Sequence, residues 1–287
     1  MKPFWSANAE CPRTEDKLIG VTRSISRRDA LKFALSAPAV VGLAALTSFP
    51  EAAAAPESEG LPHSPSRLFV ILDDASIGQR AALVEAEKRG QYLNLAVCTE
   101  FVMTSGGVNH LSWLDIQRAA AHGHGIMAHS KTHRWLTTSS DLELAEEFDY
   151  SQHVLATTTG VKVQDFVYPS SKHDFRTDSA AVSRFRRVFA GQWGGDQWRY
   201  KYRSRKPFVC GRFGWASSNH DAVIGQISSA AAAREDIVVY THATDGSNWQ
   251  TEGVTAAEFK EVLDFALKIQ MRVAHIDEFD SGPAAAR

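Results

Sequence analysis

The sequence predicts an α/β fold built around a mostly parallel sheet, and two observations lead to this prediction. Short apolar runs, of which residues 68–72 are the clearest, alternate along the chain with longer segments of helical periodicity. Glycine or a Ser/Asp cap marks the ends of several of these helical segments. Since strand–helix–strand crossovers are right-handed, the alternation gives parallel strands in a sheet that is either open or closed into a barrel.

Each expected strand is a short apolar run of the kind that is buried on both faces of a sheet. The expected strands cover residues 68–72, 93–101, 125–128, 163–168, 187–190, 237–241 and 272–274. The helices expected between them cover residues 79–89, 111–121, 141–157, 178–186, 221–233 and 255–269. In an open sheet and in a barrel alike, ligands bind at the carboxyl ends of the strands.

Composition excludes several classes of protein. The chain has 287 residues, of which 44% are hydrophobic and 22% charged, so it is neither disordered, nor collagen-like, nor a multi-span membrane protein. Its formal net charge is −2, which leaves no basic excess for binding nucleic acid. Three scattered cysteines, Cys11, Cys98 and Cys210, do not have the spacing of a thiolate zinc site.

The first 55 residues have the organisation of an export signal. A charged region with Arg27 and Arg28 precedes an uncharged apolar stretch at 33–49 and an alanine run that ends at Ala55. The apolar stretch is shorter than the ~20 residues of a bilayer-spanning helix, so we expect no stable membrane anchor. Residues 26–32 resemble a twin-arginine signal, and an ordinary Sec signal and a retained anchor helix are the alternatives.

This interpretation divides the chain into a signal peptide at 1–55, a linker at 56–66, a folded domain at 67–280 and a tail at 281–287. The twin-arginine export machinery is then a transient partner, and the mature protein is periplasmic or secreted by a bacterium. Cys98 and Cys210 reach an oxidising compartment, each within an apolar strand-like run. They either form a disulfide or stay as two separately buried thiols.

Ionisable side chains follow three of the expected strands. Asp73 and Asp74 come directly after residues 68–72, His129 and His133 follow residues 125–128, and His242 ends residues 237–241. All five therefore fall at one edge of the expected sheet, where ligands bind.

The two histidines are four residues apart, which places both imidazoles on one face of a helical turn, near enough for one cation. Imidazole together with carboxylate selects zinc, with cobalt, nickel or iron as alternatives. A capped loop with two solvated histidines is the other interpretation. The adjacent Asp73 and Asp74 repel each other unless a cation is near, although an acidic helix N-terminus would also explain them. Successive residues of an extended segment point to different sides, so one would face the metal and the other could act as a base.

These segments resemble the NodB-type polysaccharide deacetylases, the carbohydrate esterase family 4-like proteins. The family's four motifs resemble residues 72–75, 123–133, 166–171 and 238–242 of this sequence. The resemblance spans residues 68–278 and implies a distorted (β/α) barrel with about seven parallel strands. It also implies that Asp74, His129 and His133 bind a divalent metal, Zn²⁺ with Co²⁺ or Ni²⁺ as alternatives.

The same resemblance implies roles for other residues. Asp73 would be the general base and His242 the general acid. Arg212 would orient the base, although a surface arginine is the alternative. The segment Tyr168–Pro169–Ser170 would bind substrate and oxyanion, the latter through the backbone N–H of Ser170.

Two tryptophans, Trp193 and Trp198, lie in a segment rich in aromatic and basic residues and could stack on sugar rings. A hairpin packed on the barrel is the alternative for this segment. The sequence departs from the family at Ala75 and Gly125, and at Ser170–Ser171, which replace an aromatic residue and a glycine. This last departure puts the usual substrate in question.

The expected activity is metal-dependent removal of acetyl groups from an N-acetylated amino-sugar polysaccharide of the cell envelope or exopolysaccharide. An acetylated glycan is then the substrate. The alternatives are an amidase or imidase acting on a small non-sugar substrate, and a non-catalytic glycan-binding relative.

Overall fold

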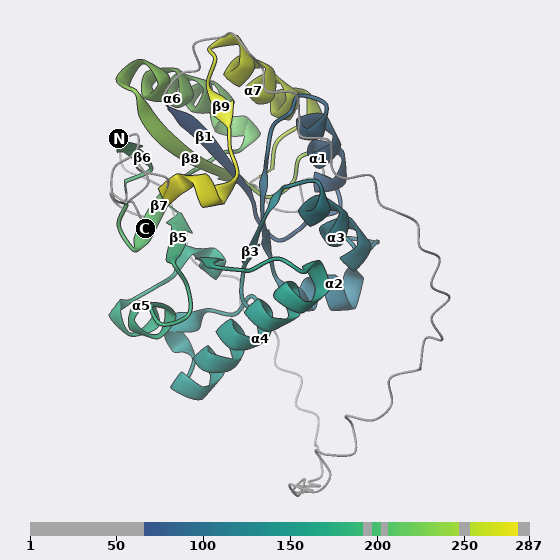
Figure 1. Cartoon of the computed structure of the whole chain (residues 1–287), viewed down its shortest axis with the longest axis vertical. Helices are drawn as coiled ribbons and strands as arrows, with labels where there is room; N and C mark the ends of the chain where they lie inside the picture. Colours follow the sequence, from purple (N-terminus) through teal and green to yellow (C-terminus); the bar gives the residue numbers. More distant parts are fainter. Residues whose placement is uncertain (1–65, 192–196, 202–205, 247–252, 281–287) are drawn as a thin grey trace, which may run out of the picture. The chain divides into compact units, whose positions relative to one another are not determined.

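The computed structural model describes residues 66–191, 197–201, 206–246 and 253–280, which form a closed barrel surrounded by helices (Figure 1). Seven parallel strands pair in the order in which they are named here, and β8 closes the barrel by pairing with β1. They are β1 (Arg67–Leu72), β2 (Asn94–Val97), β3 (Gly125–Ala128), β4 (Asp165–Val167), β5 (Arg187–Gly191), β7 (Val209–Gly214) and β8 (Glu235–Thr241). The expected barrel of about seven parallel strands is therefore confirmed.

Two short strands distort the barrel at its amino end. β9 (Arg272–Val273) runs parallel to the first residues of β1, whereas β2 pairs only with the last two residues of β1. Likewise β6 (Arg199–Lys201) runs antiparallel to the first residues of β8, and β7 pairs further along that strand. The extra strands thus fill the two places where the wall splays apart.

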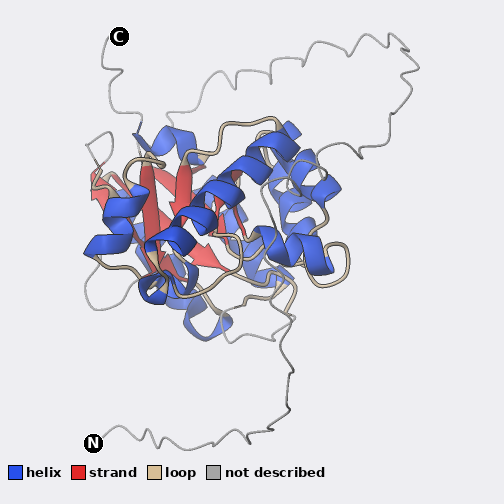
Figure 2. Cartoon of the chain, turned by 90° about the horizontal axis from the view of Figure 1, so that it is seen from below, coloured by secondary structure: helices blue, strands red, loops and turns tan. Residues whose placement is uncertain are grey.

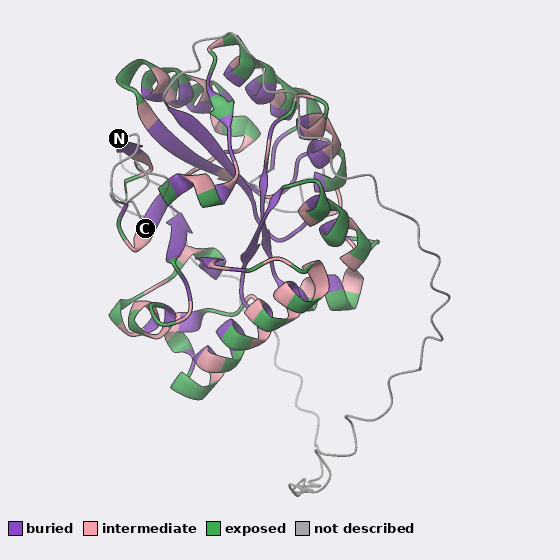
Figure 3. Cartoon of the chain, viewed as in Figure 1, coloured by how far each residue is buried: buried purple, intermediate pink, exposed green. Residues whose placement is uncertain are grey.

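The strands carry two separate apolar layers because successive side chains point to opposite faces. Phe69, Ile71 and Met127 belong to the layer inside the barrel. Leu68 and Val70 belong to the layer between the barrel and the helices. Figure 3 shows the barrel strands mostly buried, whereas the helices are exposed along their outer faces.

The helices lie around the strands (Figure 2). They are α1 (Gln79–Glu87), α2 (Thr99–Ser105), α3 (Trp113–Ala121), α4 (Asp141–Thr159), α5 (Phe175–Ala181), α6 (His220–Ala233) and α7 (Ala256–Lys268). Capping boxes at Ser112, Ser140 and Thr255 satisfy the first amide groups of α3, α4 and α7. Among the described residues, no helix combines the length and apolarity needed to cross a membrane.

Two expected boundaries are wrong, and two strands, β6 and β7, were not among the expected strands. The strand expected at 93–101 stops at Val97, and Thr99 begins helix α2, because a short apolar run does not distinguish a strand from a helix. The helix expected at 178–186 runs over Phe175–Ala181, since Asp174 caps it earlier. β6 was not expected at all, because its three residues include two cations and lack an apolar run.

Cys98 and Cys210 are both buried free thiols. The alternative of two separately buried thiols is therefore correct, and the disulfide is not formed. Burial raises the pKa of each thiol to about 12, so neither is a thiolate at neutral pH.

Candidate metal centre

The polar residues of the site continue the inward-facing series of the barrel strands. On β1, Phe69 and Ile71 line the interior, and the next position on that face, just past the strand, is Asp73. On β3, Met127 lines the interior and the next such position is His129. The period of two therefore carries each strand from an apolar core to an ionisable group at the carboxyl end.

Asp74 lies at the centre of this group. Its Oδ1 is 3.3 Å from Nε2 of His129 and 3.2 Å from Nε2 of His133. Its Oδ2 is 3.9 Å from Nε2 of His242. One ligand atom each from Asp74, His129 and His133 lies within 4.8 Å of the other two, which is close enough for a single ion.

The donor set fits a divalent metal. Both carboxylate oxygens of Asp74 are buried without a well-aligned hydrogen bond from the described residues. Nδ1 of His129 lies 2.8 Å from the carbonyl oxygen of Val167, so the ring proton belongs on Nδ1. The Nε2 lone pair of His129 then faces the Asp74 carboxylate, and a shared cation relieves the repulsion. Two imidazole nitrogens and one carboxylate oxygen match a catalytic zinc site.

Without a metal, a protonated His133 would be the group that neutralises Asp74. Burial raises the pKa of the Asp74 carboxyl, but contact with His129 and His133 lowers it more, so it lies well below its ordinary value. Burial lowers the pKa of His133, and its contact with Asp74 more than reverses this, so that pKa is raised. The site therefore favours positive charge beside Asp74.

The two histidines are not on a helical turn, which corrects the expectation from their spacing. Residues 129–133 form a tight loop in which Ser130 has φ of 65° and His133 has φ of 63°. Oγ of Ser130 accepts a hydrogen bond from the His133 N–H at 2.9 Å. This reversal brings the imidazole centroids within 4.9 Å without a helix.

Asp73 is held by Arg212, which lies 139 residues further along the chain. Nη1 of Arg212 lies 2.7 and 2.9 Å from the two carboxylate oxygens of Asp73. Both side chains are buried, so the alternative of a surface arginine is wrong. The Arg212 guanidinium also lies 4.1 Å over the ring of Tyr240. This arrangement fixes the orientation of a second carboxylate next to Asp74.

His242 follows β8 and is positioned through its backbone. Oγ of Ser76 and Nε2 of Gln79 donate hydrogen bonds to its carbonyl oxygen, at 3.0 and 2.6 Å. The same Gln79 amide donates to the carbonyl of Asp73 at 2.7 Å. Gln79 was not singled out from the sequence, yet it ties the two ends of the site together.

The third motif is only partly at the site. Tyr168 points away from the barrel interior, and its hydroxyl donates to Oδ1 of Asp178 at 2.6 Å. Burial, followed by that hydrogen bond, raises the pKa of Tyr168. The position of this side chain in the outer layer does not support the expectation that it binds substrate. Pro169 is buried at the start of a 3₁₀ turn.

Ser170 is exposed, with φ of 52°, and none of the described residues accepts a hydrogen bond from its N–H. This leaves the amide available to an oxyanion. Ser171 instead turns to the barrel, where its Oγ accepts a hydrogen bond from the Gly191 N–H at 2.6 Å.

The two tryptophans expected to stack on sugar rings have different outcomes. Trp193 lies outside the described residues. The ring of Trp198 packs 5.3 Å from that of Phe213 in the layer between barrel and helices, and its carbonyl accepts a hydrogen bond from Val238. This position favours the packed-hairpin alternative for Trp198.

Phe101 is a residue that sequence reasoning missed. Its ring stacks on His133 at a centroid distance of 5.3 Å and on His110 at 4.8 Å. Its apolar neighbours had suggested a strand, and only the helix α2 aims this ring at the site.

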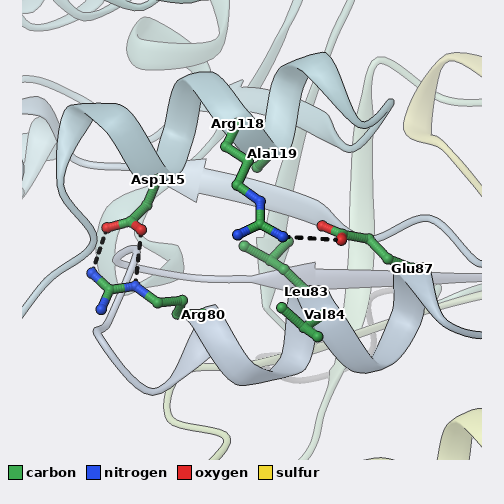
Figure 4. A pocket seen from close by; sticks show the side chains of 7 residues that line it. All are labelled: Arg80, Leu83, Val84, Glu87, Asp115, Arg118 and Ala119. Carbon is green, nitrogen blue, oxygen red and sulfur yellow. Dashed lines mark hydrogen bonds and ion pairs between the residues drawn. The ribbon is translucent and has the colours of Figure 1, made fainter. Parts of the chain in front are cut away.

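A surface pocket between α1 and α3 shares no residue with this centre (Figure 4). Its walls are bridged by Arg80, which forms hydrogen bonds of 2.8 and 2.6 Å with Asp115, and by Arg118, which lies 3.5 Å from Glu87. These ion pairs join two helices of the outer layer.

Several solved structures have a similar fold. The chain has 13% identity to a family 4 carbohydrate esterase from Streptomyces lividans, covering 76% of this chain and 95% of that one, with a TM-score of 0.52. A peptidoglycan deacetylase from Bacillus subtilis matches with 13% identity, 75% and 90% coverage and a TM-score of 0.52. A family 4 pseudoenzyme from Bacillus anthracis matches with 12% identity, 77% and 67% coverage and a TM-score of 0.53.

This chain spans 46 to 62% of the length of three other matched chains. No curated protein sequence matches the chain. Residues 94–184 match the model of the polysaccharide deacetylase family, and these residues include His129, His133 and the third motif. Residues 94–184 are thus similar to the polysaccharide deacetylase family, and the barrel has a fold similar to those of the three matched structures.

Proposed function

We propose that this protein is a metal-dependent hydrolase that removes acetyl groups from an N-acetylated amino-sugar polysaccharide of the cell envelope or exopolysaccharide. The observation that supports this proposal best is the buried Asp74 carboxylate, which faces two imidazoles and lies beside a second carboxylate clamped by Arg212. The match of residues 94–184 to the polysaccharide deacetylase family supports the substrate class.

In this proposal Asp74, His129 and His133 hold Zn²⁺, with Co²⁺ or Ni²⁺ as alternatives. When bound there, such an ion would lower the pKa of a water towards about 7 and polarise the acyl oxygen of the substrate. The N,N,O donor set is the reason to prefer zinc.

The chain's own residues then move the protons. Asp73 accepts a proton from the attacking water, whose oxygen bonds to the carbonyl carbon of the amide. Arg212 keeps the Asp73 carboxylate oriented, and the N–H of Ser170 donates a hydrogen bond to the developing oxyanion. The C–N bond then breaks as His242 protonates the leaving nitrogen, which yields acetate and a free amine.

A second candidate is an amidase or imidase for a small non-sugar substrate. Ser170 and Ser171 stand where the family has an aromatic residue and glycine, and Tyr168 faces away from the site. These positions leave fewer aromatic surfaces for a sugar at the third motif. A non-catalytic role, as in the Bacillus anthracis pseudoenzyme, is disfavoured because Asp73 and Arg212 remain paired next to the three donors.

We also propose that residues 1–55 are a twin-arginine signal, which would place the mature protein in the periplasm or outside the cell without a stable membrane anchor. The support is the Arg27–Arg28 pair ahead of a short apolar stretch and an alanine run.

Acetate release tests the hydrolase proposal directly. Purified protein would be incubated with N-acetylglucosamine oligomers, peptidoglycan fragments and small N-acetyl amides, before and after complete chelation. We expect release from the sugars that stops on chelation and returns with Zn²⁺. Unchanged activity without metal would refute the metal mechanism, release from small amides alone would favour the second candidate, and sugar binding without release would favour the non-catalytic role.

A further inference from the structure

Glu147 of α4 binds the backbone of the loop between the two histidines. Its Oε2 accepts hydrogen bonds from the N–H groups of Lys131 at 2.9 Å and Thr132 at 2.8 Å. Its Oε1 accepts the hydroxyl hydrogen of Thr132 at 2.6 Å and lies 3.3 Å from Nε of Arg134. Glu147 is 3% exposed, so these contacts are made away from bulk water.

The N–H groups of this loop depend on side-chain oxygens, because the loop's own backbone does not supply their hydrogen-bond acceptors. The N–H groups of Lys131, Thr132 and His133 all donate to side-chain oxygens, two to Glu147 and one to Ser130. Ser130 and His133 have positive φ, a conformation that costs about 1–3 kcal/mol for a residue other than glycine. Such a conformation persists only where surrounding contacts hold it in place.

Helix α4 is a rigid support for these contacts. It starts at a capping box formed by Ser140 and Glu143, and its buried residues Leu144 and Phe148 pack in the layer against the barrel. Glu147 lies between those two anchors, so the position of its carboxylate is set by core packing.

We propose that Glu147 is a positioning residue that holds the 129–133 loop in the conformation that brings both imidazoles to Asp74. It touches neither the metal ligands' side chains nor substrate, and it acts through the loop backbone. This inference rests on the proposed metal centre, because its consequence is measured as metal affinity.

Glu146 provides a matched control. It is the neighbouring residue of the same helix and pairs with the ammonium group of Lys131, which belongs to the same loop. Its side chain is 58% exposed, and the described loop amides donate to Glu147 and Ser130 instead, so its ion pair contributes little to the position of the loop. Glu146→Gln removes the same charge from the same helix while leaving the backbone contacts of Glu147 intact.

The test measures Zn²⁺ affinity by competition with a chelating dye, alongside the unfolding temperature of the metal-free protein. Glu147→Ala leaves two part-buried backbone amides without acceptors, and we expect Zn²⁺ to bind about 10- to 100-fold more weakly. Glu147→Gln should recover most of the affinity, since an amide oxygen can accept both N–H groups and its NH₂ can donate to the Thr132 hydroxyl. Glu146→Gln should bind Zn²⁺ like the unmodified protein.

Equal Zn²⁺ affinity in Glu147→Ala and the unmodified protein would overturn the proposal, even if the variant unfolds at a lower temperature. If Glu147→Ala does not fold, Glu147→Asp replaces it: the carboxylate is one methylene shorter, and unchanged affinity would again refute the proposal. Failure of the metal centre itself is distinguishable, because His129→Ala would then leave Zn²⁺ binding unchanged.

Discussion

The two ends of the barrel both bury charged side chains, but they pair them differently. At the amino end, Asp236 receives hydrogen bonds from Arg67 at 3.1 and 2.7 Å and lies 3.2 Å from the Lys206 ammonium. At the carboxyl end, Asp74 faces the imidazoles of His129 and His133, which carry charge only when protonated. The Asp236 carboxylate is therefore neutralised by the charge of Arg67, and its role is structural. The Asp74 carboxylate still requires a positive charge from a bound metal or a proton.

The apolar contacts at the two ends differ in the same sense. The 3₁₀ turn η5 (Ile276–Asp280) places the ring centroid of Phe279 5.0 Å from that of Phe69 and 5.6 Å from that of Phe189. These ring contacts close the amino end of the barrel. At the carboxyl end the inward positions are ionisable. The comparison therefore assigns stability to one end and chemistry to the other, as is common in (β/α) barrels.

The largest expected effect is at the carboxyl end. Asp73→Asn removes the proposed base while leaving Asp74 and both histidines in place. Acetate release should fall by about 10²- to 10⁴-fold, and Zn²⁺ content, measured by elemental analysis, should stay that of the unmodified protein. A rate that survives this substitution would show that another group accepts the proton.

The amino end should respond in stability instead. Asp236→Ala leaves Arg67 and Lys206 buried without their carboxylate, and the free energy of unfolding should drop by about 3–5 kcal/mol. Chemical denaturation gives this value. The control is Asp149→Ala, which removes an exposed pair with Arg184 and should cost at most about 1 kcal/mol. Similar losses in both variants would contradict the structural role of the buried group.

The metal-free protein should lose stability as the pH rises. Because the pKa of His133 is raised above 6.5 in the fold by Asp74, its contribution is fully present below about pH 6.5 and is lost as the pH rises through the folded-state pKa. Unfolding temperatures of chelated protein between about pH 5.5 and 8.5 would show the decline. His133→Gln should flatten this part of the profile, and an unchanged slope would exclude the His133–Asp74 contact as its source.

The smallest expected effect concerns the third motif. Tyr168→Phe removes a hydroxyl that contacts Asp178 in the outer layer, so stability should fall by about 1 kcal/mol and kcat should not change. Thermal unfolding and steady-state kinetics measure the two quantities. A lower kcat in a fully folded Tyr168→Phe variant would show that Tyr168 contributes to the substrate site after all.

Local pattern was sufficient for most strands and helices of the barrel. Residues 125–128 form β3 as expected, and the strand at 68–72 is one residue longer than expected. It failed where a short apolar run changes structure part-way, as at Thr99, and where a strand carries charges, as in β6, or glycines, as in β7. In these segments packing against the barrel outweighs the periodicity of the run.

The sequence by itself determined that ionisable residues follow three strands and that the strands are parallel, because both depend on patterns a few residues long. Only the tertiary structure decided which groups meet. Asp73 and Arg212 are 139 residues apart and are joined by the closure of β8 onto β1, with β7 beside β8. The positive φ values of the histidine loop, and the buried carboxylate of Glu147 that supports it, likewise depend on how α4 packs against the barrel. Strand order and helix packing bring distant residues together, and no local periodicity encodes these contacts.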